Sequence, residues 1–359
     1  MRRIQGWLVV LCCTTLSGES PTYVGANTCA TCHAAQFAQQ SASGHARSLY
    51  PAAEHPLAAS FAPSRRLLRK PNYRFQFSLS PGQFRVQVFD DENVMDIPIE
   101  WAFGAGEQAV TFVSRVNEDW YVEHYYSYYT ALRSLAPTPG QQALEPKTLP
   151  EAVGLVYKSL DPQAGIKGCF ECHSTGPVSV EPDRKIRPSE SGVCCEACHG
   201  AGSLHVRTAT EGKIARAREL IQNPKRLASA ELNRFCGTCH RPPAGAGVAI
   251  DWGYAWNVRH QPVYFSQSAC FRKSNGALSC LTCHNPHEPL RKNDSAYYNQ
   301  RCGTCHHAKL RPPSEVCQSR LPSNCVDCHM PRVSPQSPLR FSNHWIGVYR
   351  QDARLKPSR

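Results

Sequence analysis

Cysteine and histidine are the residue types whose spacing in this sequence most strongly indicates chemistry. The pattern Cys-x-x-Cys-His occurs seven times, whereas random placement of 19 cysteines and 15 histidines would give roughly 0.04 copies. We number these motifs 1 to 7 along the chain. Their cysteines are Cys29 and Cys32, Cys169 and Cys172, Cys195 and Cys198, Cys236 and Cys239, Cys280 and Cys283, Cys302 and Cys305, and Cys325 and Cys328. Their histidines are His33, His173, His199, His240, His284, His306 and His329.

The spacing within each motif suits one particular reaction. Two thiols three positions apart can form thioethers with the two vinyl groups of one haem, and the adjacent imidazole then reaches the iron as its proximal ligand. The sequence therefore predicts seven covalently attached c-type haems. The fourteen motif cysteines are the expected attachment residues, and the seven motif histidines are the expected proximal iron ligands.

Three other uses of cysteine fit less well. Zinc sites contain Cys-x-x-Cys pairs but do not require a histidine after every second cysteine. Thioredoxin-like redox pairs occur once or twice in a βαβ context rather than as an array. A complete set of intramolecular disulfides is impossible because the cysteine count of 19 is odd.

The eight remaining histidines are candidates for the distal, sixth iron ligand. Two glycines before His205 let its backbone lie close to a porphyrin, and a proline turns His287 away from the haem of its own motif. His55 lies between Glu54 and Pro56, and His307 is crowded against His306, so both fit less well. The candidate distal ligands are His45, His205, His287 and His344, followed by His124 and His260.

Methionine is too scarce to supply most distal ligands. Only Met1, Met95 and Met330 are present, and Met330 directly follows a proximal histidine. Bis-histidine ligation is therefore expected, which favours low potentials. Because few of the other histidines are well placed, we also hypothesise that at least one haem lacks a protein sixth ligand, an arrangement that permits small-molecule chemistry.

The positioning elements follow from how closely the motifs are spaced. Six motifs fall within residues 169–329, which leaves about 27 residues for each haem. That is too little chain to wrap each haem separately, so the haems must pack against one another. The expected fold is mostly α and irregular, with a haem-stacked core. Short helices at 213–222, 230–235 and 295–301 are expected, several running into a motif.

Between motifs 1 and 2 the pattern changes to β. Aromatic and aliphatic residues alternate with polar ones over 73–79 and 84–88, and further strands are indicated as far as residue 129, so an antiparallel β-meander is inserted here. We expect a signal peptide at 1–20, motif 1 plus the meander at 21–135, a linker at 136–165, a six-haem domain at 166–345 and a solvated basic tail at 346–359.

The first residues predict export. Arg2 and Arg3 precede an uncharged apolar run at 7–16 and then a polar, small-residue exit, which is the pattern of a secretory signal peptide. An amphipathic or buried first helix is the alternative. No later run reaches eighteen apolar residues, so no transmembrane helix is expected downstream. The expected location is the periplasm or another extracytoplasmic space.

The formal net charge of +12 first suggests a nucleic-acid partner. Each haem brings two propionates, however, so the basic residues are expected to balance these carboxylates, and no nucleic-acid partner is expected. Among the cysteines outside the motifs, Cys12 and Cys13 belong to the signal peptide. Cys270 and Cys317 form a plausible disulfide in an exported protein, and Cys194 is left over.

Three longer boxes resemble those of exported multihaem c-type cytochromes. They are Cys-x-x-Cys-His-Gly-x-Gly-Ser-x-His at 195–205, Cys-x-x-Cys-His-x-Pro-His at 280–287 and Cys-x-x-Cys-His-Met-Pro at 325–331. The chain looks like the tetrahaem electron carrier of nitrifying bacteria and the hydroxylamine oxidoreductase and pentahaem nitrite reductase group. The resemblance covers 22–50 and 166–345, and it implies that His205 and His287 are distal ligands.

The sequence also departs from that group. The active haem of the nitrite reductases has lysine in place of the proximal histidine, and no motif here ends in lysine. Seven haems match neither the five nor the eight of those enzymes, and the β-meander does not carry over from them.

The function expected from these observations is electron transfer along a chain of mostly bis-histidine haems. The partners would be redox proteins or quinol-linked donors. The alternative is an oxidoreductase acting on a small nitrogen or sulfur compound at one open haem, and a haem-based sensor is a third class. The sequence leaves enzymatic activity and oligomeric state open.

Overall fold

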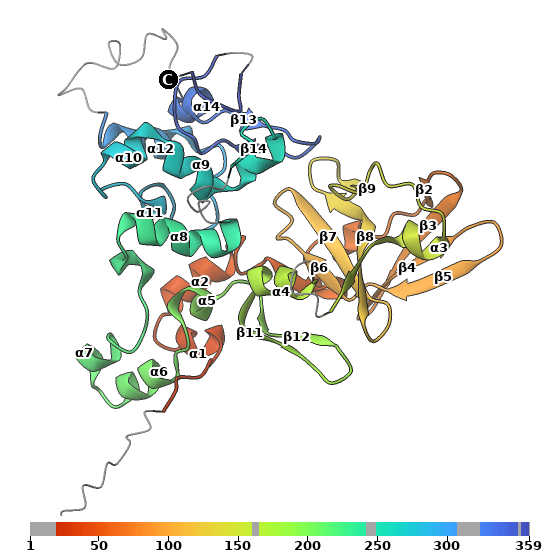
Figure 1. Ribbon diagram of the computed structural model, residues 1–359. Helices are drawn as coiled ribbons and strands as arrows, with labels where there is room; N and C mark the ends of the chain where they lie inside the picture. The colour runs from red at the N-terminus through yellow and green to blue at the C-terminus, as the bar shows by residue number, and fades with distance from the viewer. Residues whose placement is uncertain (1–18, 160–164, 242–248, 307–323, 351–352, 359) are drawn as a thin grey trace, which may run out of the picture.

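A computed structural model describes residues 19–159, 165–241, 249–306, 324–350 and 353–358. Figure 1 shows two lobes, a helical one that carries the motifs and a β lobe beside it. His307, Cys317 and nearly all of the expected signal peptide lie outside the described residues. No helix in the described ranges is long and apolar enough to cross a membrane.

The β lobe consists of two antiparallel sheets. One has the order β2 (Leu67–Arg69), β3 (Tyr73–Ser80), β4 (Gln83–Phe89), β5 (Val94–Pro98). The other has the order β1 (Leu49–Pro51), β6 (Trp101–Phe103), β7 (Ala109–Arg115), β8 (Trp120–Tyr129), β10 (Gly154–Lys158), and β9 (Ser134–Pro137) also pairs with β8. The alternation in the sequence places Phe75, Phe77 and Phe84 in the core between the sheets. The predicted antiparallel strands are confirmed, but they form two sheets rather than one meander.

Residues 136–165, which the sequence predicts to be a linker, contain regular secondary structure. It contains the end of β9, helix α3 (Leu149–Val153), and β10, which pairs with β8 over five residues. Gly154 begins β10 opposite His124, where a Cβ would clash with the Glu123 carbonyl, so this close approach requires glycine. Residues 136–137 and 154–158 of the expected linker are therefore part of the sheet.

The helical lobe consists of short helices joined by loops. The helices are α1 (Ala26–Ala30), α2 (Ala34–Ser41), α4 (Lys167–His173), α5 (Cys195–His199), α6 (Ser203–Thr210), α7 (Ile214–Ala217), α8 (Ser229–His240), α9 (Gln261–Gln267), α10 (Ala269–Lys273), α11 (Cys280–Cys283), α12 (Ser295–Gly303) and α14 (Cys325–His329). Single 3-10 turns are η1 (Ala52–Glu54), η2 (Ala58–Ser60), η3 (Pro224–Arg226) and η4 (Ala255–Arg259). Two hairpins complete it, β11 (Ser174–Val180) with β12 (Ile186–Ser191), and β13 (Arg332–Val333) with β14 (Phe341–Ser342).

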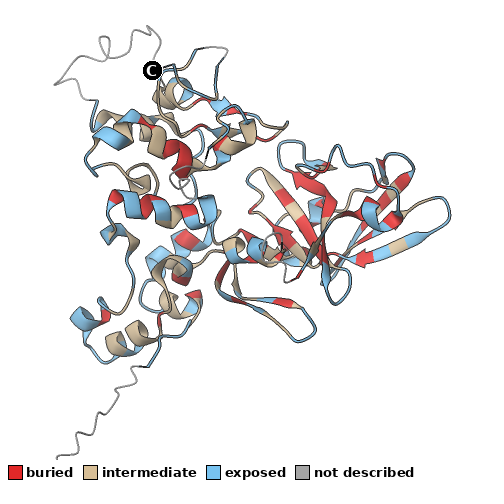
Figure 2. Cartoon of the chain, viewed as in Figure 1, coloured by how far each residue is buried: buried red, intermediate tan, exposed pale blue. Residues whose placement is uncertain are grey.

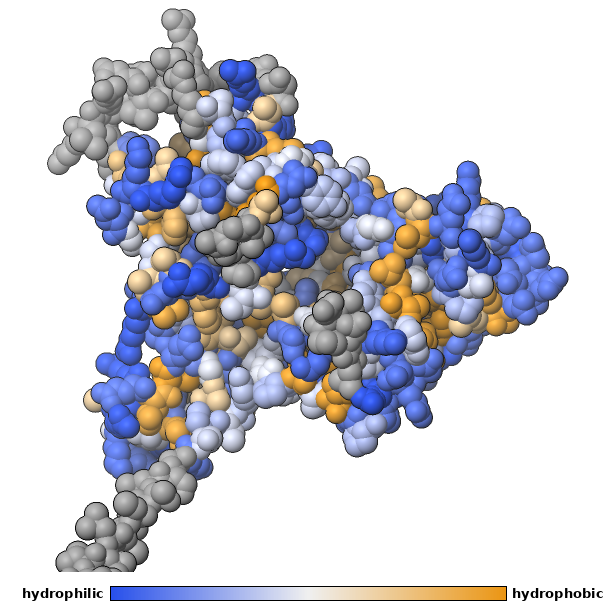
Figure 3. Space-filling model, viewed as in Figure 1, coloured by the Kyte–Doolittle hydropathy of each residue, from blue (hydrophilic) through white to orange (hydrophobic). Residues whose placement is uncertain are grey.

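Burial is distributed unequally between the lobes. Figure 2 shows long buried runs on the strands of the β lobe but only scattered buried residues on the helices. Helices α6, α10, α11, α12 and α14 bury none of their residues fully. Figure 3 accordingly shows apolar side chains at the surface of the helical lobe. The side chains of this lobe do not by themselves form a continuous core.

The two lobes meet around motif 2. Phe170, inside that motif, packs with Ile166 against Phe103 and Tyr121 of the β lobe. The Tyr121 hydroxyl accepts a hydrogen bond of 2.8 Å from the Ile186 amide at the start of β12. A second link is the ion pair between Lys292 and Glu107. Motif 2 is therefore held on the edge of the β lobe.

Candidate haem-binding site

The seven motifs lie on helical turns. Motifs 2, 3 and 7 lie wholly on α4, α5 and α14, motif 4 ends α8, and motifs 1, 5 and 6 begin on α1, α11 and α12. Cysteines three positions apart on a helical turn face the same side, as attachment to one haem requires. All fourteen motif thiols are free and none is fully buried. The described Cys, His, Asp and Glu side chains nowhere gather in a group of three or more that could hold a metal ion.

Four motif histidines each face a second imidazole ring. The ring centres are 6.4 Å apart for His33 and His205, 5.9 Å for His240 and His45, 6.0 Å for His199 and His287, and 6.2 Å for His284 and His344. The angles between the ring planes are 21°, 73°, 5° and 37° in the same order. The second members are His205, His45, His287 and His344, the four histidines placed first among the distal candidates.

This spacing fits one iron between two rings. An imidazole nitrogen binds a first-row metal at about 2 Å, so two imidazoles on opposite sides of one metal ion have their ring centres about 6 Å apart. The four pairs therefore have the separation that axial ligation of a haem iron needs.

Hydrogen bonds to the backbone orient five of the motif and candidate distal histidines. In each, Nδ1 donates to a backbone carbonyl oxygen: His173 to Ser48 (3.1 Å), His199 to Gln222 (2.7 Å), His205 to Ala217 (2.8 Å), His329 to Gly347 (2.8 Å) and His344 to Ser342 (3.0 Å). A proton fixed on Nδ1 leaves the Nε2 lone pair for a metal, and metal-ligating histidines usually donate their other ring N–H in this way.

Burial keeps two of the candidate distal imidazoles in the neutral form. It lowers the pKa of His344 to about 4, with the neighbouring His284 adding to the effect. It also lowers the pKa of His45, which faces His240. Neutral imidazole is the form that binds a metal, so these rings are in the ligating form at neutral pH.

Two further histidines, His55 and His124, form hydrogen bonds inside the β lobe. His55 is buried in the β lobe, where Nδ1 accepts from the Leu57 amide and Nε2 donates to the Gly104 carbonyl, both at 3.0 Å. His124 lies in the middle of β8 with Nε2 2.6 Å from the Ser114 hydroxyl, and burial lowers its pKa to about 3. The structure places both rings inside the β lobe and brings neither to a motif histidine.

Three motif histidines have no such partner among the described residues: His173, His306 and His329. Of the remaining candidates, His260 caps the start of α9, and burial, with Arg241 and Arg259 adding to it, lowers its pKa to about 4. His307 lies outside the described residues.

Contacts between motifs indicate which sites are neighbours. Four pairs of thiols from different motifs lie close together: Cys29 and Cys195, Cys172 and Cys239, Cys236 and Cys280, and Cys302 and Cys325. Cys198 of motif 3 lies near Cys236 and Cys239, and Cys302 of motif 6 lies near Cys283. Motifs 1, 3, 4, 5, 6 and 7 therefore follow one another in space, and motif 2 adjoins motif 4. Sequence spacing gives no signal for the contact of motif 2 with motif 4, because motif 3 lies between them in the chain.

The cysteines outside the motifs have their own surroundings. The Cys194 amide donates to the Thr175 hydroxyl at 2.7 Å, which fixes the residue before motif 3, and its thiol is free. The Cys270 thiol is also free among the described residues. The disulfide expected between Cys270 and Cys317 stays a prediction, because Cys317 is not described.

Comparisons with known proteins agree with this site. The family model for cytochrome c554 and c-prime matches residues 141–200, which include motifs 2 and 3. Over 181 residues the chain is 24% identical to the multihaem cytochrome MtrA of Shewanella baltica, a match that spans 47% of this chain and 47% of that protein. The chain thus spans about half the length of this relative. The crystal structure of the outer cell wall cytochrome OcwA covers 90% of this chain and 79% of its own, with a TM-score of 0.49 and 16% identity. The family-model match and the similarity to MtrA support a multihaem c-type cytochrome family for this chain, in agreement with its repeated Cys-x-x-Cys-His motifs.

Proposed function

We propose that this protein is an exported seven-haem cytochrome that transfers electrons along a chain of mostly bis-histidine haems. The observation that carries the proposal is the set of four imidazole pairs with ring centres 5.9 to 6.4 Å apart. When bound, haem supplies an iron that alternates between ferrous and ferric states, and two imidazoles on that iron favour a low potential.

The pairs tie distant parts of the chain together. His205 follows motif 3 but faces His33 of motif 1, and His45 follows motif 1 but faces His240 of motif 4. His287 follows motif 5 but faces His199 of motif 3. Each of these motifs thus has its distal ligand beside another motif, so ligation at one site positions its neighbour. This arrangement keeps the sites close, as electron transfer between them requires.

The thiol contacts suggest the order of the sites. The proposed path runs through motifs 1, 3, 4, 5, 6 and 7, because each motif in this series is near the next. Motif 2 is a branch at motif 4, since Cys172 contacts Cys239. The branch ends under the β lobe, where Phe170 packs against Phe103. Electrons could therefore enter or leave at three ends: motif 1, motif 2 and motif 7.

The packing of the helical lobe supports a full set of haems. Several of its helices have no fully buried residue, and apolar side chains stand at its surface. Porphyrin faces laid against these helices would supply the missing apolar contacts. We therefore propose a haem-stacked core for the six motifs within 169–329, with haem binding and folding of this lobe coupled.

A spectroelectrochemical titration of the purified holoprotein tests electron transfer. We expect seven electrons per chain, a haem-to-protein ratio near seven, and midpoint potentials that are mostly well below that of a His–Met cytochrome. Redox proteins or quinol-linked donors outside the cytoplasm are the proposed partners. A preparation that holds zinc and no haem would contradict the proposal.

The count of histidines favours a second candidate function. Four distal histidines are paired, and His55 and His124 bond to other groups. Only His260 and His307 then remain for the haems of three motifs, His173, His306 and His329. With seven haems bound, at least one lacks a distal histidine from its own chain. Such a haem could bind a small nitrogen or sulfur compound, so oxidoreductase activity at an open site is the second candidate.

A further inference from the structure

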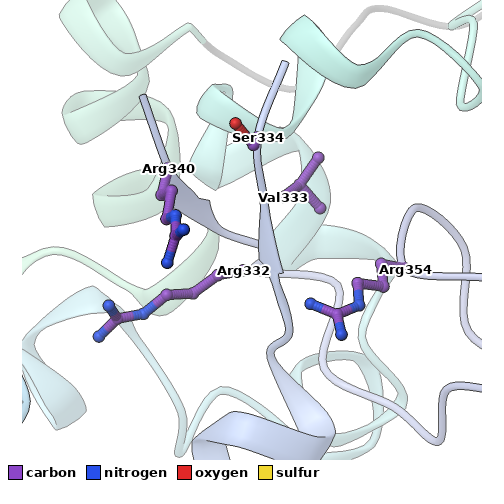
Figure 4. Close-up of a pocket in the computed structure, with 5 residues that line it drawn as sticks. All are labelled: Arg332, Val333, Ser334, Arg340 and Arg354. Atoms are coloured by element: carbon purple, nitrogen blue, oxygen red, sulfur yellow. The ribbon is translucent and has the colours of Figure 1, made fainter. Parts of the chain in front are cut away.

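A cavity of about 360 Å³ lies at the end of the helical lobe beside motif 7. Five residues line it: Arg332, Val333, Ser334, Arg340 and Arg354. Figure 4 shows that the side chains of Arg332 and Arg340 lie close together on one side of the β13 strand, while Arg354 extends toward it from the other side. Three arginines from three separate segments therefore line one cavity.

The backbone around the cavity is well fixed. β13 pairs with β14, with Arg332 opposite Ser342 and Val333 opposite Phe341. The side-chain amide of the fully buried Asn343 donates to the carbonyls of Arg354 (2.9 Å) and Leu355 (3.0 Å). These bonds hold 354–355 against the sheet, so this part of the tail is not the freely solvated basic end expected from the sequence. Arg354 is positioned by the fold.

Among the described residues, no carboxylate forms an ion pair with the positive charges of the cavity, although twelve ion pairs involve other residues. Arg332 donates to the neutral Asn293 side chain at 2.5 Å. Three like charges repel one another, and a bound anion would relieve that repulsion. Arginine forks also match the oxygens of carboxylates and phosphates.

The cavity adjoins the last site of the proposed path. Arg332 follows His329 of motif 7 by three residues, and the Nδ1 of His329 donates to the Gly347 carbonyl in the segment after β14. A ligand bound here would lie beside the terminal motif. The volume of about 360 Å³ lies within the range for small-molecule sites, so the cavity has room for a small anion.

We propose that Arg332, Arg340 and Arg354 bind a small anion through carboxylate or phosphate oxygens. Two sources can supply that chemistry. One is a soluble oxyanion, and the other is a propionate of the haem carried by motif 7. The second source rests on the proposed function, whereas the first does not.

The test uses the full-length holoprotein with its haem content measured on every sample. Arg340→Gln and Arg354→Gln each remove one guanidinium charge from the cavity. Arg218→Gln, at the exposed end of α7 and without an ion pair among the described residues, is the matched control. Each protein is titrated with inorganic phosphate in a calorimeter, and its midpoint potentials are then measured.

A soluble ligand predicts saturable one-to-one binding of phosphate that weakens about tenfold in each cavity variant and is unchanged in the control. A propionate predicts no phosphate binding, together with a downward shift of one midpoint potential in both cavity variants, because a positive charge next to that haem is lost. If both cavity variants match Arg218→Gln in binding and in potentials, the anion site is refuted. Loss of haem in the unsubstituted protein would instead count against the proposed function, and the phosphate titration would still report on the cavity.

Discussion

His199 of motif 3 and His287, which follows motif 5, face each other with ring centres 6.0 Å apart and planes only 5° apart. The Nδ1 of His199 is bonded to the Gln222 carbonyl at 2.7 Å, so its Nε2 is available to a metal. Two residues 88 positions apart in the chain thereby form the pair that we propose as axial ligands of one haem. The pairing gives a geometric basis for assigning distal ligands that sequence spacing alone does not provide.

Replacing His287 with methionine tests this pair directly. We expect one haem of the set to change from bis-histidine to His–Met ligation, with its midpoint potential shifted upward and the other potentials nearly unchanged. Potentiometry and the ferric absorption spectrum measure the change.

His55→Gln is the matched control for His287→Met. His55 bonds to the Leu57 amide and the Gly104 carbonyl, so its replacement is expected to cost about 1–3 kcal/mol of stability and to leave the haem spectrum unaltered. A normal spectrum in the His287 variant, or an altered one in the His55 variant, would contradict the assignment.

The ring-plane angles predict distinct paramagnetic resonance signals. Nearly parallel imidazoles give a rhombic low-spin ferric signal, and nearly perpendicular ones give a highly anisotropic signal with a large first g value. The pair at 5° belongs to the first type and the pair of His45 and His240, at 73°, to the second. The ferric holoprotein should therefore show both signals. His45→Ala should remove the anisotropic one and leave the rhombic one, whereas loss of the rhombic signal would contradict the pairing.

Carbon monoxide tests the shortage of distal histidines. The haems of three motifs, whose proximal histidines are His173, His306 and His329, have only His260 and His307 as remaining candidates for a distal ligand. At least one reduced haem is therefore expected to bind carbon monoxide. Absorption difference spectra of the reduced protein give the number of binding sites. A spectrum unchanged by the gas, with only low-spin ferric signals, would remove the basis for the oxidoreductase candidate.

Acid is expected to destabilise the β lobe through His124. Burial lowers the folded-state pKa of His124 to about 3 from 6.5, so acid protonates the unfolded chain first. The stabilisation is full above pH 6.5 and is lost as pH falls toward 3, which amounts to about 2 kcal/mol between pH 7 and pH 5. Denaturant unfolding followed by the β-sheet circular dichroism signal measures it. His124→Gln should unfold with a shallower pH dependence over this interval, and an identical slope would show that His124 is not the titrating group.

The local features of this protein were well predicted from sequence. The motifs depend only on spacing, and the strands at 73–80 and 83–89 depend on strict alternation, which is a local signal. The four leading distal candidates were selected by glycines, a proline turn and neighbouring residues, and these are the four that face motif histidines.

The features that were not predicted depend on long-range pairing. β10 is short, and only its pairing with β8 makes it part of the sheet, so residues 136–165 resembled a linker. His124 resembled a free ligand because its bond to Ser114 crosses from β8 to β7. The tail resembled a solvated end because Asn343, which anchors it, carries no signal in the sequence.

The central claim is that each of the seven motifs holds one covalently attached haem. Intact mass spectrometry of the denatured holoprotein measures this most directly, because thioether-bound haems stay with the chain after unfolding. We expect a mass equal to the mature polypeptide plus seven haems. A mass equal to the polypeptide alone, with all fourteen motif thiols free to react with an alkylating reagent, would contradict it.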